Sequence, residues 1–177
     1  MGVLRAREEG LAVAIVNTTI ILGPGKWAQG SAALIKNIAE GFNFYTQGIN
    51  GFVDVRDVAD IMLRLATEDI EGERFVIVAE NLTYQNVFAQ MAVALGIKGP
   101  QIEVKPWMSA LAWRWEAVKS YFSGKPPLVT KETARTSLGE YYYKNDKVKE
   151  SLNYQFRPIK ETIKDLASFY QQAQQAQ

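Results

Sequence analysis

The sequence predicts an α/β fold with parallel strands, and three observations support this class. Two apolar runs, in segments 11–16 and 73–79, are typical of strands that are buried on both faces of a parallel sheet. Segments with apolar residues at helical spacing alternate with these runs along the chain. The 177 residues are 47% hydrophobic and 22% charged, which is the composition of an ordinary globular domain.

The first part of the chain divides at clear breaker residues. After a charged N-terminal helix, an apolar strand over 11–17 leads to a Gly-Pro-Gly breaker at 23–25. Ser31 is a suitable N-cap for the helix that follows. Alternating apolar residues predict a short strand over 42–46, and the glycine-containing segment 47–51 predicts a turn.

Two further helices are predicted on either side of the second apolar strand. The extended stretch 52–55 leads into the first of them, whose predicted buried stripe consists of Val58, Ile61, Met62 and Leu65. The second follows the strand over 73–79, with Thr83 as its N-cap and Gly96 at its end.

The remainder of the chain predicts smaller elements. These are a short strand over 102–104, a Trp-rich helix over 107–122, a short helix over 131–135, a strand or loop at 141–143, a brief Lys-rich helix and a final amphipathic helix over 159–170. The Gln-Ala tail at 171–177 is expected to fray.

Histidine and cysteine are both absent from the sequence, which narrows the possible chemistry. The absence of cysteine removes disulfides, thiolate nucleophiles and zinc–thiolate sites. The absence of histidine removes His-based triads and most transition-metal sites. Catalysis would therefore use Asp, Glu, Lys, Tyr, Ser or Thr, or a cofactor, and we predict no metal site.

Charge and hydropathy exclude two classes of partner. The charged N-terminus is unlike a signal peptide, and no apolar run approaches the ~20 residues that a membrane span requires. The 20 basic and 19 acidic residues nearly balance, and no basic–aromatic signature of a nucleic-acid-binding module occurs. We therefore expect a cytoplasmic protein that binds neither membranes nor nucleic acid.

The segment 23–26, Gly-Pro-Gly-Lys, invites comparison with phosphate-binding loops but fits neither type. A dinucleotide fingerprint needs a glycine where Ala28 stands, and a P-loop needs Ser or Thr where Trp27 stands. We interpret the segment as a turn between a strand and a helix.

Two segments carry a resemblance to a known family: Asn-Thr-Thr-Ile-Ile-Leu-Gly-Pro-Gly at 17–25 and Gly-Phe-Val-Asp-Val-Arg-Asp-Val-Ala at 51–59. They resemble the later half of an extended short-chain dehydrogenase/reductase. The similarity is to the NAD(P)-dependent epimerase/dehydratase group, and within it to the dihydroflavonol-reductase-like branch. It implies the later strands and helices of a Rossmann-type parallel sheet, together with the smaller substrate-binding lobe.

The resemblance also implies a division of the chain. Residues 1–97 would form the C-terminal part of the Rossmann-type domain, with an insertion near 31–67 that belongs to the lobe. Residues 98–177 would form mainly the substrate-binding lobe and the C-terminal helices. Independently of the family, only two strands show the pattern of full burial, and a two-stranded sheet is marginal alone. We therefore expect the later half of a larger α/β protein.

The family's two chemical motifs have no counterpart in this sequence. These are the glycine-rich dinucleotide loop and the Tyr-x-x-x-Lys pair, in which Tyr serves as acid or base beside the nicotinamide. Tyr143 and Lys147 have the spacing but lie far outside the family's position. We therefore predict no catalytic residue here and no cofactor bound by this chain alone, with NAD or NADP bound by the full-length protein.

The resemblance places Asn17, Thr18 and Thr19 in the strand-end segment beside the nicotinamide and substrate, although the family usually has Pro where Thr18 stands. Ligands of open α/β sheets also bind beyond the carboxyl ends of strands. A Thr19 that caps a turn is the alternative. Other predicted pocket residues come from the lobe, namely Tyr84, Trp107 and Lys131, with Lys125 and Thr133 as weaker candidates.

Two other sets of residues have a structural interpretation beside a functional one. Asp54, Arg56 and Asp57 would suit a carboxylate-dyad mechanism, but we predict that Asp57 caps a helix and that Arg56 is its charge partner. Trp113 and Trp115, with Trp107, would suit a flat ligand, but aromatic residues at helical spacing are more typical of a core.

The sequence thus predicts the substrate-binding half of an NAD(P)-dependent oxidoreductase or epimerase, inactive by itself. Its expected partners are a small-molecule substrate, the missing N-terminal Rossmann half and a second copy in a homo-oligomer. Two alternatives remain open. One is a non-catalytic module that binds a ligand or another protein, and the other is a chain that pairs with a separately encoded Rossmann half.

Overall fold

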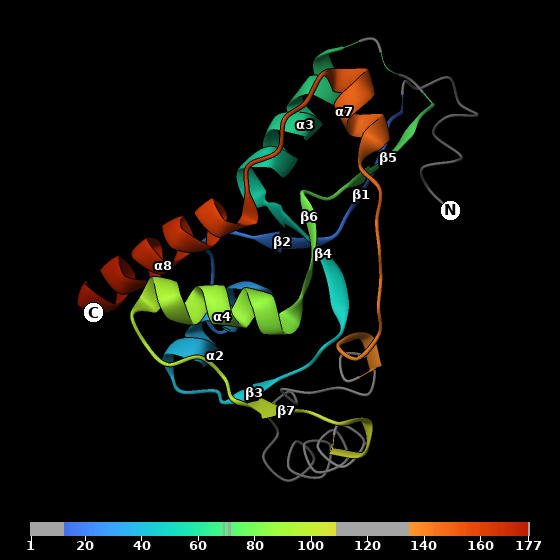
Figure 1. Cartoon of the computed structure of the whole chain (residues 1–177). Coiled ribbons are helices and arrows are strands. Elements are labelled where there is room, and N and C mark those ends of the chain that lie inside the picture. Colours follow the sequence, from blue (N-terminus) through green and yellow to red (C-terminus); the bar gives the residue numbers. More distant parts are fainter. Residues whose placement is uncertain (1–12, 69, 71, 109–134, 177) are drawn as a thin grey trace, which may run out of the picture.

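The computed structural model describes residues 13–68, 70, 72–108 and 135–176, and these form an α/β fold (Figure 1). The strands lie in three small sheets, with the orders β1-β5, β2-β4-β6 and β3-β7. The predicted fold class is therefore confirmed. In the described part of the chain, no helix combines the length and hydropathy needed to cross a membrane.

The two apolar runs of the sequence pair with each other. β1 (Ile15–Thr18) runs parallel to β5 (Arg74–Ile77), with Thr18 opposite Ile77. The full burial predicted for both strands is wrong for β1, whose last two residues, Asn17 and Thr18, are exposed. The physical reason is that β5 is the only strand paired with β1 among the described residues, so one edge of β1 has no strand beside it.

β4 (Ile49–Asp54) is the centre of the second sheet, parallel to β2 (Ile20–Leu22) and antiparallel to β6 (Glu80–Thr83). The turn predicted at 47–51 is wrong, because the strand already begins at Ile49. The glycine content that indicated a turn has a different cause: Gly51 stands where neighbouring strands approach closely.

Three helices pack against the β2-β4-β6 sheet: α2 (Ala32–Ala39), α4 (Tyr84–Leu95) and α8 (Ile159–Gln175) (Figure 1). The core between them includes Leu22, Ile35, Phe52, Met91, Ile163 and Leu166. Near the far end of α8, the rings of Tyr170 and Trp27 meet edge to face, with centroids 5.2 Å apart. Because α8 continues to Gln175, the fraying predicted for the tail is wrong over 171–175.

The helix ends agree with the sequence at α4 and depart from it at α2. The Thr83 hydroxyl accepts a hydrogen bond of 3.1 Å from the Asn86 N–H, and Gly96 ends α4 with a φ of 70°. Ser31 occupies the N-cap position of α2, but its hydroxyl donates to the Ile21 carbonyl and does not cap the helix.

A second core lies between α3 (Val55–Thr67), α7 (Asp146–Leu152) and the β1-β5 pair (Figure 1). It includes Val53, Val58, Ile61, Leu65, Phe75, Ile77, Val148 and Leu152. Three members of the predicted α3 stripe are therefore buried. Met62, the fourth, is 54% exposed, because it lies on a flank of the helix and not on its buried face.

The small β3-β7 pair, β3 (Phe44–Tyr45) with β7 (Ile102–Glu103), is parallel and shorter than the predicted strands. Residues 141–143 form a segment without regular secondary structure. Residues 109–134 lie outside the described part of the chain, so the helices predicted over 107–122 and 131–135 stay untested.

Two buried carboxylates fix the start of α3, and the first is Asp54. Its carboxylate caps the helix, accepting hydrogen bonds from the Arg56 N–H at 2.7 Å and from the Thr162 hydroxyl of α8 at 2.8 Å. The guanidinium of Arg56 also pairs with Asp54 at 2.6 Å and reaches Asp165 of α8 at 2.9 Å. Asp54 therefore joins β4, α3 and α8.

The second carboxylate is Asp57, which is fully buried in the first turn of α3. It accepts hydrogen bonds of 3.0 Å from the Tyr154 hydroxyl and from the Arg157 N–H, and it forms an ion pair with the Arg157 guanidinium. The prediction that Asp57 caps α3 with Arg56 as its partner is wrong. The residue with the extended backbone of an N-cap is Asp54, and Arg56 pairs with Asp54 instead of Asp57.

We predict an acid-dependent loss of stability at Asp54. Burial works to raise the pKa of this carboxyl, but hydrogen bonds from Arg56 and Thr162 outweigh burial and hold the pKa below its ordinary 3.8. Because the folded-state pKa is the lower one, the stabilisation is fully present above pH 3.8 and is lost as the pH falls through the folded-state pKa. Asp54→Asn should lower the free energy of unfolding by about 1–3 kcal/mol at pH 7, measured by urea denaturation. The difference should shrink below pH 3.8.

The matched control is Asp165→Asn, which removes the exposed carboxylate bound to the same guanidinium. A surface ion pair of this kind contributes at most about 1 kcal/mol. Equal losses in the two variants, or a difference for Asp54→Asn that persists unchanged in acid, would contradict the assignment.

Candidate functional site

The carboxyl end of β1 presents two of the predicted site residues to solvent. Asn17 and Thr18 are exposed where β1 ends, at the position where ligands of open α/β sheets bind. Thr19 is half-buried, and both its N–H and its hydroxyl donate to the Ile77 carbonyl, at 3.2 and 3.1 Å. Thr19 therefore bonds to the neighbouring strand and does not cap a turn.

A strand junction lies immediately beside Thr19. A Cβ atom at Gly51 would lie 2.6 Å from Thr19 Cγ2 and 2.9 Å from Val78 Cγ2, which is closer than carbon atoms can approach. The Ala79 N–H donates to the Phe52 carbonyl across the same junction. β2 follows β1 in the chain and β6 follows β5, and β4 lies between β2 and β6. The absence of a side chain at Gly51 allows β4 to enter between them.

Next to the junction, the buried side chain of Asn50 contacts the half-buried predicted site residue Tyr84. The buried Asn50 accepts a hydrogen bond of 2.8 Å from the Gly51 N–H and donates one of 3.3 Å to the Tyr84 hydroxyl oxygen. Burial raises the pKa of Tyr84, so the hydroxyl stays protonated at neutral pH. Because the oxygen accepts from Asn50, the hydroxyl proton is directed elsewhere and can be donated to a ligand.

Thr19 and Tyr84 therefore contact consecutive residues of β4, Gly51 and Asn50, whose side chains point to opposite faces of the sheet, and Trp107 contacts neither. Its side chain is 67% exposed, just beyond β7. Lys131 lies outside the described residues, as do Lys125, Thr133, Trp113 and Trp115. Asn50 is not among the predicted site residues, because its Asn-Gly pair indicated a turn. The alternation of Ile49, Gly51 and Val53 was the signal that could have placed it on a strand.

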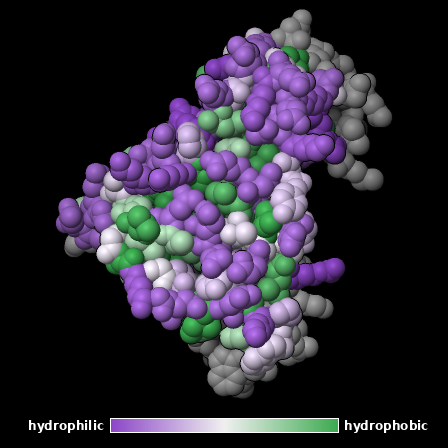
Figure 2. Space-filling view, viewed as in Figure 1, coloured by the Kyte–Doolittle hydropathy of each residue, from purple (hydrophilic) through white to green (hydrophobic). Residues whose placement is uncertain are grey.

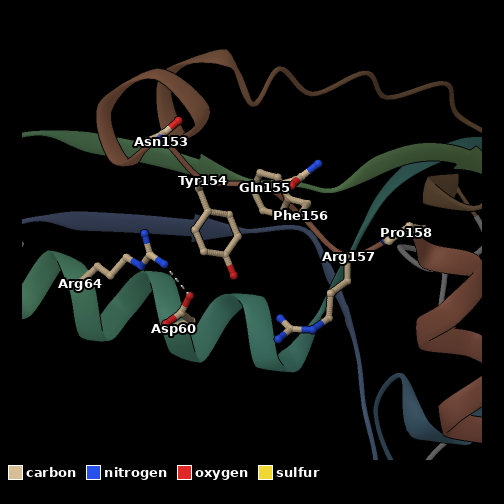
Figure 3. Close-up of a pocket in the computed structure, with 8 residues that line it drawn as sticks. All are labelled: Asp60, Arg64, Asn153, Tyr154, Gln155, Phe156, Arg157 and Pro158. Carbon is tan, nitrogen blue, oxygen red and sulfur yellow. Dashed lines mark ion pairs between the residues drawn. The ribbon is translucent and has the colours of Figure 1, made fainter.

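A surface hollow lies elsewhere, between α3 and residues 153–158, which we call the strap (Figure 3). It is an open hollow of about 540 Å³, and a neighbouring one of about 450 Å³ shares the strap. The charges around it are matched, because Arg64 pairs with Asp60 at 3.4 Å and Arg157 pairs with Asp57. No predicted site residue lines either hollow, so we assign the strap a structural role.

The chain is similar in sequence to one curated protein and similar in fold to several solved structures. No family model matches the chain. A putative dihydroflavonol 4-reductase from Synechocystis is 26% identical over 175 residues, which is 95% of this chain and 51% of that protein.

Solved structures show the same partial match. A nucleoside-diphosphate-sugar epimerase from Pseudomonas aeruginosa superposes with a TM-score of 0.74 at 18% identity, covering 97% of this chain and 52% of its own. A dTDP-glucose 4,6-dehydratase from Bacillus anthracis, solved in complex with NAD, gives a TM-score of 0.65 at 12% identity over 96% of this chain and 48% of its own. The chain therefore has a Rossmann-like α/β fold and spans about half the length of the proteins it matches.

We predict that Gly51 is required by the strand junction. Gly51→Ala should lower the free energy of unfolding by about 1–3 kcal/mol, because the added methyl group would overlap the branched side chains of Thr19 and Val78. Chemical denaturation of the variant measures this loss. Gly99→Ala is the control, since a Cβ there would lie 3.5 Å from the Ala92 Cβ, an ordinary contact. If both variants are equally stable, the junction does not need a glycine.

Proposed function

We propose that this chain is the substrate-binding half of an NAD(P)-dependent oxidoreductase or epimerase/dehydratase of the extended short-chain dehydrogenase/reductase family. One observation carries the proposal: nearly the whole chain matches only about half of each related enzyme, with the same fold. The complementary half would supply the glycine-rich loop and the Tyr-x-x-x-Lys pair. The chain alone is inactive, and the complete enzyme works in the cytoplasm.

In this account the chain contributes one wall of the substrate pocket. Asn17 and Thr18 offer hydrogen-bonding groups at the exposed end of β1, and the Tyr84 hydroxyl offers a proton next to the strand junction. These groups suit a substrate with several hydroxyl or carbonyl oxygens, a class that includes dihydroflavonols and nucleotide sugars. Lys131 and Trp107 would complete the wall from the lobe.

The residues of this chain could lie beside the nicotinamide end of NAD or NADP, but they do not fit its diphosphate. The polar end of β1 is exposed and free to face a ligand, but the Gly-Pro-Gly-Lys segment at 23–26 lacks the spacing that holds a diphosphate. When bound to the complete enzyme, the cofactor supplies the hydride. This chain positions the substrate against the nicotinamide and excludes water from the side of the substrate that faces away from the cofactor.

The proposal predicts that dinucleotide binding needs the complementary half. The isolated chain should show no micromolar binding of NADH or NADPH in titration calorimetry. A single-chain chimera, with the first half of the Synechocystis relative placed before this chain, should bind one of them at micromolar concentration. Micromolar binding by the isolated chain, or none by a folded chimera, would contradict the proposal.

The proposal also predicts a substrate-binding role for Tyr84. In the chimera, Tyr84→Phe should lower kcat/KM for a dihydroflavonol or a nucleotide sugar by about tenfold, the loss of one hydrogen bond to the substrate. The dinucleotide Kd should not change. Tyr142→Phe, in which the parent residue is 67% exposed, is the control and should leave kcat/KM unchanged. A Tyr84→Phe enzyme as active as the control would remove Tyr84 from the pocket.

A further inference from the structure

The hydrogen bond between Asn50 and Tyr84 has a fixed direction, which Gly51 determines. The Gly51 N–H is only a donor, so the amide oxygen of Asn50 must face it, and the two atoms lie 2.8 Å apart. The amide NH2 of Asn50 is thereby left to donate to the Tyr84 hydroxyl oxygen, at 3.3 Å. Asn50 is 6% exposed, so little water reaches the amide to replace either bond.

Tyr84 is held at its backbone and at its ring. Its N–H, the first of α4, donates to the Gly48 carbonyl at 3.1 Å. Its ring contacts the rings of Phe52 and Phe88, with centroids 5.9 and 6.1 Å away. The hydroxyl hydrogen can still turn about its C–O bond, but a proton pointed at the Asn50 NH2 would meet another donor. The Tyr84 proton therefore points away from Asn50.

Two more phenols approach Tyr84, from the segment beside β4 that leads to α7. The Tyr141 N–H donates to the Ile49 carbonyl at 2.9 Å, and the Tyr143 backbone exchanges two hydrogen bonds with the Asn81 side chain. Burial is the main cause that raises the pKa of Tyr84, and both phenols add to this rise. Neither phenol bonds to the Tyr84 hydroxyl, and no other described residue accepts its proton. The proton is therefore available to a ligand.

The surface near this segment differs from that of the helix that follows it. Figure 2 shows hydrophobic and intermediate residues where the segment passes β4, whereas the surface over α7 is largely hydrophilic. Tyr141 itself is 39% exposed. A ligand that reaches Tyr84 from this side meets phenol rings as well as hydroxyl groups, which suits a molecule with both apolar and polar parts.

We propose that Asn50 is a positioning residue, which directs the Tyr84 proton to an acceptor oxygen of the substrate. The inference rests on the proposed function, in which the complementary half provides a separate tyrosine for the reacting carbonyl. The oxygen at Tyr84 is then a second one that carries no proton of its own: a carbonyl, ether or phosphoryl oxygen. A substrate with an ammonium or amide N–H at this point places a donor against a donor and is rejected.

Asn50→Asp reverses the bond while it changes a single group. A carboxylate still accepts from the Gly51 N–H, but it also accepts the Tyr84 proton and turns it away from the substrate. In the single-chain chimera, assayed with dihydroquercetin or UDP-glucose, kcat/KM should fall about tenfold, the loss of one hydrogen bond. The loss should appear as a higher KM with little change in kcat, because the contact is made equally in the ground state and in the transition state.

A double-mutant cycle with Tyr84→Phe separates positioning from structural support. Without the Tyr84 hydroxyl, Asn50→Asp should change kcat/KM by less than about twofold, because no proton is left to direct. Asn50→Ala should show the same dependence on Tyr84 without an added charge, and it serves in place of Asn50→Asp if that variant does not fold. Asn86→Asp is the matched control: it places the same charge on the exposed side of α4, two residues from Tyr84, and should leave kcat/KM unchanged.

The direction of the bond is also measured in the isolated chain. The bond from Asn50 partly offsets the effect of burial on the pKa of Tyr84. In Asn50→Asp the carboxylate accepts the phenol proton instead, so the pKa of Tyr84 should rise further. The ultraviolet difference titration between each protein and its Tyr84→Phe counterpart isolates this group, and an unchanged or lower pKa overturns the inference.

Dinucleotide binding and turnover by the parent chimera separate the two proposals. If the chimera is active and Asn50→Asp is as active as its parent, the positioning role is overturned and the proposed function stands. An equal loss with and without the Tyr84 hydroxyl also overturns the positioning role, since Asn50 would then act only on Gly51. A folded chimera that binds no dinucleotide and turns over neither probe contradicts the proposed function, and the inference falls with it.

Discussion

The rest of the structure depends on the burial of two carboxylates at the start of α3. A buried carboxylate is tolerated only when it is paired and hydrogen-bonded. Asp54 finds its partners on α3 and α8, and Asp57 finds its partners on the strap. These bonds fix the rotation of α3 about its own axis. That rotation in turn presents Asp57 to the strap and leaves Met62 exposed among the described residues.

The same first turn of α3 connects the scaffold to the candidate site. Asp54 is the last residue of β4, and three residues earlier in that strand Gly51 allows the close approach to Thr19. Asn50, which precedes Gly51 in the same strand, donates a hydrogen bond to the Tyr84 hydroxyl. Thr19 and Tyr84 are therefore both positioned by one strand, which is itself anchored by the buried carboxylate of Asp54. A site built on regular elements in this way needs little further support from loops.

The sequence was sufficient for the features that depend on local patterns. The α/β class, the parallel pairing of the two apolar runs and the ends of α4 all follow from periodicity and capping residues. Features that depend on distant partners were not predictable. The separate roles of Asp54 and Asp57 at the start of α3 depend on Thr162 and Arg157, about a hundred residues away, which no local pattern reveals. Gly51 was misinterpreted for the same reason, because its close neighbours belong to other strands.

The central claim is that this chain is one half of a two-part enzyme. The most direct test is the intact mass of the natural protein isolated from its source cells, together with peptide coverage before Met1. The account predicts a polypeptide of roughly twice this length, as two domains of this size imply, with a glycine-rich loop and a Tyr-x-x-x-Lys pair in its first half. A natural product of 19.8 kDa that co-purifies with no second chain carrying those motifs would contradict it.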